Sequence, residues 1–277
     1  MNCINYINGV WQLDSESKVP IHDTGFSLGD GLFETIRFDN RIILNPKKHL
    51  QRLFSGLELI RINQGLNYLE VMLLLDKIVE KNMFKSGLIR LMITRGVLEG
   101  GAAWEYEGPS GVYLTIRPLA KLPKVPVKVV FYPEKKYPII RFTPAIKSLN
   151  YIGNILAKKD AINDNAYEPV FYNSEGFITE CAIRNIFFIK DSTLITPSTN
   201  LGVLPGVMRD TIILIAKKLN LKISETYIRY IDINKMDEAF ISSTGIGLLP
   251  CFWDGWNSKF KLTATIEKQL NYIIYNH

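Results

Sequence analysis

The chain has 277 residues, of which 47% are apolar and 22% charged, and its formal net charge is +6. This length predicts two domains rather than one small core, and the mixed charges are typical of a soluble globular protein. The basic residues form scattered pairs rather than a polybasic arm, and no apolar run is long enough to span a bilayer, so we expect neither a nucleic-acid partner nor a membrane partner. The three cysteines form no pattern, which predicts a reduced, cytoplasmic setting, and the histidines lack the spacing of metal ligands, which predicts no metal site.

The first part of the chain alternates predicted hairpins and helices. One hairpin turns at Asn8-Gly9, and a second covers residues 32–44. Asn45-Pro46 is a helix-start signal. The apolar stripe of that helix is Leu50, Leu53, Phe54, Leu57 and Ile60. The pattern predicts a helix packed on a sheet.

A second helix is predicted over residues 67–82, with Leu69, Leu73 and Ile78 facing the core. The strands GLIRLMITRG and GVYLTIRP follow it.

The segment PLAKLPKVP has three prolines and no apolar periodicity. Proline continues neither a helix nor a central strand, so we predict a linker at residues 119–126. This linker would join a small domain, residues 1–118, to a larger domain, residues 127–277.

The second part of the chain is predicted to contain seven strands and three helices. The strands are VKVVFY, PVFYN, GFITE, IRNIFFIK, TLITP, LKISETYI and EAFISS. One helix begins at Leu149 and buries a stripe of Leu149, Ile152 and Leu156, which leaves Lys158 and Lys159 on a solvated face. The other helices cover about 206–219 and 262–275. This element order favours an α+β fold over a doubly wound one.

Lys147 differs from the lysines after it because it lies between Pro144 and the first helical turn, outside the solvated face. Downstream, Pro205-Gly206 leads into a helix whose first amides could bind an anion, although an ordinary turn explains the same pattern. Ser243, Thr244 and Gly245 offer hydroxyls and amides that could also bind an anion, but an ordinary polar turn explains these residues equally well.

Arg52 on the first helix and Glu180 at a strand end both also fit a solvated surface. Taken together, however, an amine, a carboxylate and several anion-binding groups are the inventory of a pyridoxal phosphate site.

Six stretches, in this order and spacing, resemble the class IV (fold-type IV) pyridoxal phosphate enzymes, which include branched-chain aminotransferases, D-amino acid aminotransferases and aminodeoxychorismate lyases. The stretches are HDTGFSLGDGLFETIR, HLQRL, IKSLNYIGNILAKKDA, GFITECAIRNIFFI, ITPSTNLGVLPGVMRD and EAFISSTG. The resemblance implies a two-domain α+β fold, with a small α/β N-terminal domain and a larger β-barrel-like C-terminal domain that binds pyridoxal 5′-phosphate. It also implies a homodimer.

The resemblance implies a role for each matched residue. Lys147 would be the catalytic Schiff-base lysine, Glu180 would pair with the pyridine nitrogen, and Arg52 would bind the phosphate. The other implied cofactor-binding residues are Tyr151, Leu204, Gly206, Val207, Met208, Ser243 and Thr244. The substrate-binding candidates are Phe33, Arg37, Arg90 and Gly245. Two positions depart from the branched-chain pattern, since Tyr151 is one residue closer to Lys147 and Met208 replaces a threonine.

The family members differ in reaction. The segment ITRGVLEGGAAW lacks the Arg-x-His of D-amino acid enzymes, whereas FETIR and LIRLMI resemble branched-chain enzymes. The stretches SLGDGLFET, TECAIRN and GVMRD are closer to the lyase. We therefore predict an aminotransferase that moves an amino group from a small, branched-chain-like amino acid to a 2-oxo acid. The alternative is 4-amino-4-deoxychorismate lyase, which releases pyruvate and 4-aminobenzoate. A catalytically silent binding protein is a third reading, which the presence of both Lys147 and Glu180 disfavours.

Overall fold

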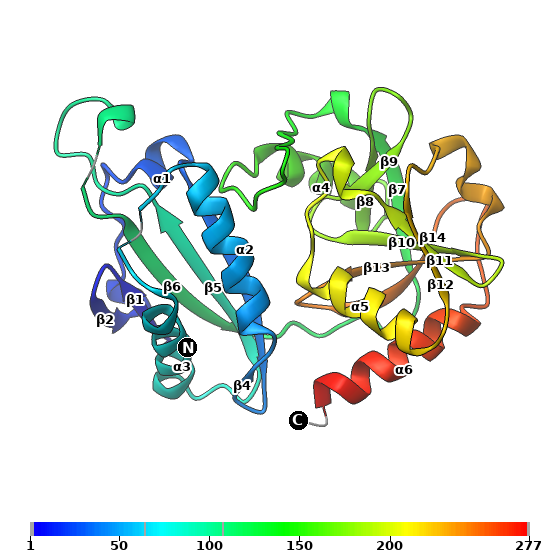
Figure 1. Cartoon of the computed structure of the whole chain (residues 1–277), viewed down its shortest axis with the longest axis horizontal. Helices are drawn as coiled ribbons and strands as arrows, with labels where there is room; N and C mark the ends of the chain where they lie inside the picture. The colour runs from blue at the N-terminus through cyan, green and yellow to red at the C-terminus, as the bar shows by residue number, and fades with distance from the viewer. Residues whose placement is uncertain (1–2, 64, 107, 276–277) are drawn as a thin grey trace. The chain divides into compact units, whose positions relative to one another are not determined.

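The computed structural model describes residues 3–63, 65–106 and 108–275, and the chain divides into two compact units. Unit 1 comprises Met1–Ala120 and Ile146–Asn150, and unit 2 comprises Lys121–Ala145 and Tyr151–His277. Each unit contains both helices and a sheet, which confirms the predicted α+β class (Figure 1). The short segment Ile146–Asn150, which the sequence-based domain limits place in the larger domain, packs with unit 1.

Unit 1 is built on a six-stranded antiparallel sheet of order β2-β1-β6-β5-β3-β4. Its strands are β1 (Ile4–Ile7), β2 (Val10–Leu13), β3 (Gly31–Asp39), β4 (Ile42–Ile43), β5 (Gly87–Thr94) and β6 (Gly111–Pro118). Its helices are α1 (Thr24–Leu28), α2 (Pro46–Leu59) and α3 (Tyr68–Lys81). Both predicted hairpins are present, whereas α1 was not predicted.

One face of this sheet forms the core of unit 1 with α2 and α3. Strand pairing aligns Ile36 with Ile89 and Ile116 across β3, β5 and β6, and all three side chains are buried. From α2, Leu50, Leu53 and Leu57 pack against them, as the predicted stripe requires. Because side chains alternate along a strand, the residues next to Ile36 and its partners face the other side of the sheet.

The predicted inner face of α3 is largely wrong. Leu69 and Leu73 are 70% and 66% exposed, while the buried residues of the helix are Val71, Leu75, Ile78 and Val79. The sequence YLEVMLLLDKIV has apolar residues on every side of the helix, so apolar spacing alone does not select which side packs.

Unit 2 is built on an eight-stranded mixed sheet of order β12-β11-β10-β13-β14-β7-β8-β9. Its strands are β7 (Val127–Pro133), β8 (Glu168–Tyr172), β9 (Ile178–Cys181), β10 (Asn185–Lys190), β11 (Thr193–Pro197), β12 (Lys222–Thr226), β13 (Glu238–Ser243) and β14 (Gly247–Phe252). Its helices are α4 (Ile152–Asn163), α5 (Val207–Lys218) and α6 (Lys261–Tyr275). Strand β9, at one end of this order, also contacts β10 and β11 near the other end, so the sheet curls back on itself (Figure 1). Strand β14 was not predicted.

The predicted stripe of α4 is also wrong. Ile152 and Leu156 are 64% and 42% exposed, and the buried positions are Gly153, Ala157 and Ala161. Small residues allow this helix to approach its neighbours closely, because a Cβ atom added at Gly153 would lie 2.5 Å from the Pro138 carbonyl oxygen.

Lys158 is correspondingly not a solvated lysine, because its Nζ lies 2.7 Å from the carboxylate of Glu168, which is fully buried.

None of the helices in the described ranges is both long enough and apolar enough to cross a membrane. In the same ranges, no group of three histidine, cysteine or acidic residues is arranged to hold a metal ion.

Candidate active site

Lys147 lies on an extended segment that pairs with the beginning of β3. The amide of Phe33 donates to the Lys147 carbonyl (2.9 Å), and the amide of Leu149 donates to the Gly31 carbonyl (3.0 Å). These two bonds fix the backbone on both sides of the Lys147 side chain. Its Nζ lies 4.4 Å from the centre of the Phe33 ring, within the range of a cation–π contact. Backbone pairing and an aromatic ring thus hold the amine in place.

A buried carboxylate, Glu34 of β3, lies under helix α2. His49 and Arg52, three residues apart on α2, both face it. Arg52 donates from Nε to Oε1 and from Nη2 to Oε2 of Glu34, both at 2.7 Å, and His49 Nδ1 lies 2.7 Å from Oε2. Two parallel bonds of this kind fix both the position and the plane of a guanidinium. The Glu34 side chain is fully buried, and that of Arg52 is 13% exposed.

The charges around Glu34 favour its ionised form. Burial raises the pKa of Glu34, but Arg52 and His49 together outweigh burial and lower it to about 2. Burial lowers the pKa of His49, and the positive charges of Arg52 and Lys147 lower it further against the opposing effect of Glu34. The ionised Glu34 therefore acts as a fixed support for the Arg52 guanidinium.

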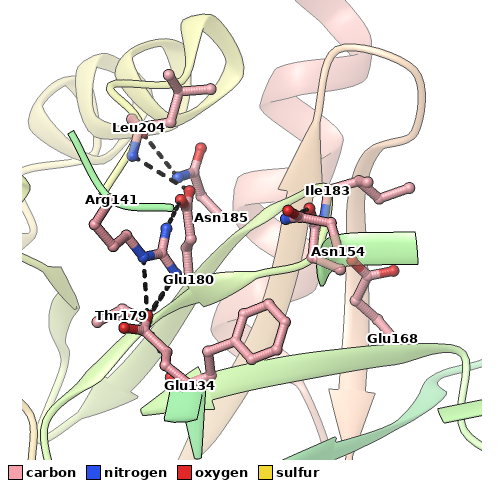
Figure 2. A network of polar contacts seen from close by, with 11 residues as sticks. Glu134, Arg141, Asn154, Glu168, Thr179, Glu180, Ile183, Asn185 and Leu204 are labelled. Carbon is pink, nitrogen blue, oxygen red and sulfur yellow. Dashed lines mark hydrogen bonds and ion pairs between the residues drawn. The ribbon is translucent and has the colours of Figure 1, made fainter. Parts of the chain in front are cut away.

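Glu180 of β9 is held by a network within unit 2 (Figure 2). Arg141 Nη1 donates to Oε1 of Glu180, and the Leu204 amide donates to Oε2 (3.3 Å). Arg141 also donates from Nε and Nη2 to Glu134 Oε1 (2.9 and 2.6 Å), which Thr179 Oγ1 contacts at 2.6 Å. Burial lowers the pKa of Arg141, but the two carboxylates outweigh burial and raise it. A charged guanidinium thus orients the Glu180 carboxylate.

The beginning of α5 can bind an anion. Its N-cap is Gly206, which has no side chain to bond the first amides, those of Val207 and Met208. Asn185 Nδ2 donates to the Leu204 carbonyl (3.0 Å) just before this turn (Figure 2). A Cβ atom added at Gly206 would lie only 2.0 Å from Asn185 Oδ1, so a larger residue here would force the Asn185 side chain to move.

The remaining predicted cofactor residues belong to unit 2. Ser243 ends β13, and Thr244 and Gly245 lie in the turn before β14. Asn185 pairs with Ser242 across β10 and β13, so this turn lies at the same end of the sheet as the start of α5. Tyr151 is the N-cap residue of α4 and is half-buried.

The predicted substrate residues of unit 1 lie in different surroundings. The Cζ atom of Arg90 is 4.5 Å from the centre of the Phe33 ring, so this ring contacts both Arg90 and Lys147. Arg37 is buried, and its Nη2 lies 2.9 Å from Asp39 Oδ2, which balances its charge. Phe33 and Arg90 are therefore near the amine, whereas Arg37 has a carboxylate partner of its own.

Sequence reasoning missed Glu34, His49, Arg141 and Asn185 as members of these networks. Two signals were available: Glu34 occupies a core-facing position of a strand otherwise lined by apolar residues, and His49 precedes Arg52 by three residues on a helix. Arg141 gave no comparable signal, because it lies in an irregular segment between β7 and α4.

Comparisons with known proteins agree on one family. The sequence pattern described as Amino-transferase class IV matches residues 31–251. The chain is 29% identical over 267 residues to a Methanocaldococcus jannaschii protein provisionally named a branched-chain-amino-acid aminotransferase, which covers 96% of this chain and 93% of that protein. It is 32% identical to a D-alanine aminotransferase of Listeria monocytogenes serotype 4b over 246 residues, or 85% of this chain and 82% of that protein.

Among solved structures, the chain is similar to a branched-chain aminotransferase from the archaeon Thermoproteus uzoniensis in complex with norvaline. The TM-score is 0.90 and the sequence identity is 22%, and the match covers 99% of this chain and 95% of that one. This similarity supports the fold.

Proposed function

The chain belongs to the class IV aminotransferase family, and from this premise we propose that it is a pyridoxal 5′-phosphate-dependent aminotransferase. In this proposal it moves an amino group from a small, branched-chain-like amino acid to a 2-oxo acid. The observation that carries the proposal is the placement of Lys147, whose backbone is fixed against β3 and whose amine lies against Phe33.

The residues present fit the cofactor. In unit 1, Lys147 offers an amine and Arg52 a guanidinium already oriented by Glu34, which suits a phosphate. In unit 2, α5 begins after Gly206, whose lack of a side chain suits the binding of an anion by the first amides of the helix. Glu180 offers a carboxylate that Arg141 holds in place.

Each of these groups has a defined task. Pyridoxal phosphate, when bound, supplies an aldehyde that links to amines and a ring that withdraws electrons from the carbon bearing the amino group. Lys147 Nζ accepts the proton from that carbon and later returns one. Glu180 stabilises positive charge on the ring nitrogen. Arg52 and the amides of Val207 and Met208 bind the phosphate.

Replacement of Lys147 by alanine tests the assignment. We expect loss of covalent cofactor attachment, read by mass spectrometry after borohydride reduction, and a loss of amino transfer of about 10⁴-fold, at the upper end for a lost proton-transfer group. Lys159→Ala, on the exposed side of α4, is the matched control and should retain both properties. Cofactor recovered on Lys158 or Lys159 would refute the role of Lys147.

Activity assays on the same purified protein distinguish an aminotransferase from a lyase. Pyruvate and 4-aminobenzoate released from aminodeoxychorismate, with no amino transfer from any common amino acid, would replace the proposal by the lyase.

We also propose a homodimer, for which light scattering should give twice the chain mass of 31.6 kDa. A fully active monomer would contradict the homodimer.

A further inference from the structure

Glu180, the residue proposed to meet the ring nitrogen, lies where the pairing of its strand is irregular. Val170 of β8 pairs with Cys181 of β9. The other aligned pair is Tyr172 with Ile178, so two residues of β9, one of them Glu180, lie opposite a single residue of β8. Such a bulge bends the strand and re-aims a side chain, but it leaves the extra residue outside the regular ladder of hydrogen bonds. The direction of Glu180 therefore depends on how the chain beside it is held.

The chain after Glu180 is held by a side chain from α4. Residues 182–184 form the turn that joins β9 to β10, and Asn154 Nδ2 donates to the Ala182 carbonyl at 2.6 Å (Figure 2). The Ala182 amide in turn donates to the Pro169 carbonyl of β8 (3.2 Å). Both backbone polar groups of Ala182 are thus bonded, two residues after Glu180.

A buried carboxylate holds the next residue of the same turn. Glu168 of β8 is fully buried, and its Oε1 accepts a hydrogen bond from the Ile183 amide (2.9 Å). Its Oε2 accepts from Lys158 Nζ (2.7 Å) and from Arg184 Nη1. Lys158 Nζ and Arg184 Cζ each lie 4.7 Å from the centre of the Tyr167 ring. Because two cations bond this carboxylate, it is a fixed acceptor for the turn.

Asn154, Lys158 and Glu168 act together as one clamp on this turn. Asn154 and Lys158 are four residues apart, so they lie on the same face of α4. Beyond the turn, Asn185 donates to the carbonyl that lies just before the turn into α5. The clamp therefore holds the stretch of chain that joins two residues of the candidate site, Glu180 and Asn185.

We propose that Asn154 is a positioning residue, which acts through the clamped turn to hold the Glu180 carboxylate where it can bond the ring nitrogen of pyridoxal phosphate. The inference rests on the proposed function, because it assumes that the cofactor binds with its ring nitrogen at Glu180. Hydrogen bonds weaken steeply when their angle or length departs from the favoured range. A displaced Glu180 would keep its charge but would bond the ring nitrogen less well.

Binding of two forms of the cofactor tests the position of Glu180. The probes are pyridoxal phosphate and its deaza analogue, in which a C–H group replaces the ring nitrogen and cannot bond a carboxylate. Equilibrium dialysis should show pyridoxal phosphate binding at least about 10-fold more tightly, the preference typical of a hydrogen bond to a charged group. Asn154→Ala should reduce this ratio by about threefold or more, as the loss of one ordinary hydrogen bond does. A general loss of structure would weaken the binding of both forms equally, and an unchanged ratio would overturn the proposal.

Two further variants of α4 control for shape and for a general effect of the helix. Asn154→Asp keeps the shape but cannot donate to the Ala182 carbonyl, so the ratio should fall at least as far as in Asn154→Ala. Its negative charge suits the first turn of a helix, which offsets part of the lost stability. Asn163→Ala makes the same replacement at the exposed last residue of α4 and should leave the ratio unchanged. An unchanged ratio in Asn154→Asp, or an equal fall in Asn163→Ala, would contradict the role of Asn154.

Glu180→Gln, measured with the same two probes, separates this inference from the proposed function. This variant should lose most of the preference for pyridoxal phosphate, because it removes the charge that bonds the ring nitrogen. If the ratio is the same in Glu180→Gln as in the unmodified protein, the proposed role of Glu180 and the role of Asn154 both fail. If Glu180→Gln abolishes the preference but Asn154→Ala retains it, only the role of Asn154 fails.

Discussion

Each unit pairs a glutamate with an arginine, but the two pairs are built in opposite ways. In unit 1, the fully buried Glu34 orients the more accessible guanidinium of Arg52. In unit 2, Arg141 bonds two carboxylates and orients Glu180; the two side chains are 20% and 14% exposed. The same chemical pair thus presents a cation in one unit and an anion in the other. In each unit the supporting residue has a second partner, His49 for Glu34 and Glu134 for Arg141, and the comparison teaches that this second contact leaves the other charge of the pair to meet a ligand.

The largest expected effect on stability comes from removing the buried support in unit 1. Glu34→Gln keeps the shape but leaves Arg52 and His49 without their carboxylate, and breaking a buried pair costs about 3–5 kcal/mol. Urea unfolding should show this loss. The control is Glu58→Gln, on the exposed surface of α2, the helix that carries Arg52 and His49. It should change the free energy of unfolding by less than about 0.5 kcal/mol. Equal stability of the two variants would mean that Glu34 is not the support described above.

The corresponding change in unit 2 should affect turnover rather than stability. Glu180→Gln removes the charge that Arg141 orients, and we expect amino transfer to fall about 100- to 1000-fold, the loss typical of a fixed electrostatic group. Cofactor should remain bound, and the melting temperature should change little. The decisive measurement is the rate of a single half-reaction, and turnover within twofold of the unmodified protein would remove Glu180 from the proposed mechanism.

The buried pair in unit 1 should make the free energy of unfolding depend on pH in the acidic range. The pKa of Glu34 is lowered from 4.5 to about 2, so its ionised form stabilises the fold fully above about pH 4.5 and loses that contribution as pH falls towards 2. The contribution is on the order of 3 kcal/mol. Unfolding free energies measured between pH 5 and pH 2 should fall less steeply in Glu34→Gln. Parallel curves for the variant and the unmodified protein would contradict the assignment.

A smaller effect should follow from filling the turn before α5. Gly206→Ala places a methyl group against Asn185 Oδ1, and overpacking of this kind costs about 1–3 kcal/mol. Asn185→Ala removes the clashing atom, so the double variant should be more stable than the two single losses predict. Thermal unfolding of all four proteins measures this coupling. If the losses of stability in the two single variants add up in the double variant, the two residues do not interact.

The fold was predicted where one local signal was sufficient. The Asn8-Gly9 turn and the Asn45-Pro46 helix start both appear where expected, because turn chemistry and a proline at the first helical position act over a few residues. The Asn45 side chain, however, makes no cap hydrogen bond to the helix. The buried faces of α3 and α4 were not predicted. The apolar residues of α3 surround the helix, and the contact face of α4 is formed by glycine and alanine, which a search for large apolar side chains overlooks.

For the site, the sequence indicated which residues could bind or react, but not which residues orient them. Lys147, Arg52 and Glu180 were singled out by motif, and their roles stay predictions. Their supports, Glu34 and Arg141, come from distant parts of the chain, and charge type alone does not show which ion pairs form.

The segment Ile146–Asn150 has a consequence for biosynthesis. Unit 1 includes these residues although the ribosome makes them after the whole of β7, so its first 120 residues do not contain all of its contacts. The amides of Phe33 and Leu149 acquire their pairing partners only when both stretches of chain have emerged. A nascent chain that stops at Ala120 therefore exposes the beginning of β3. An expression fragment meant to isolate unit 1 would need the later segment supplied as well, either as an added peptide or through a redesigned connection.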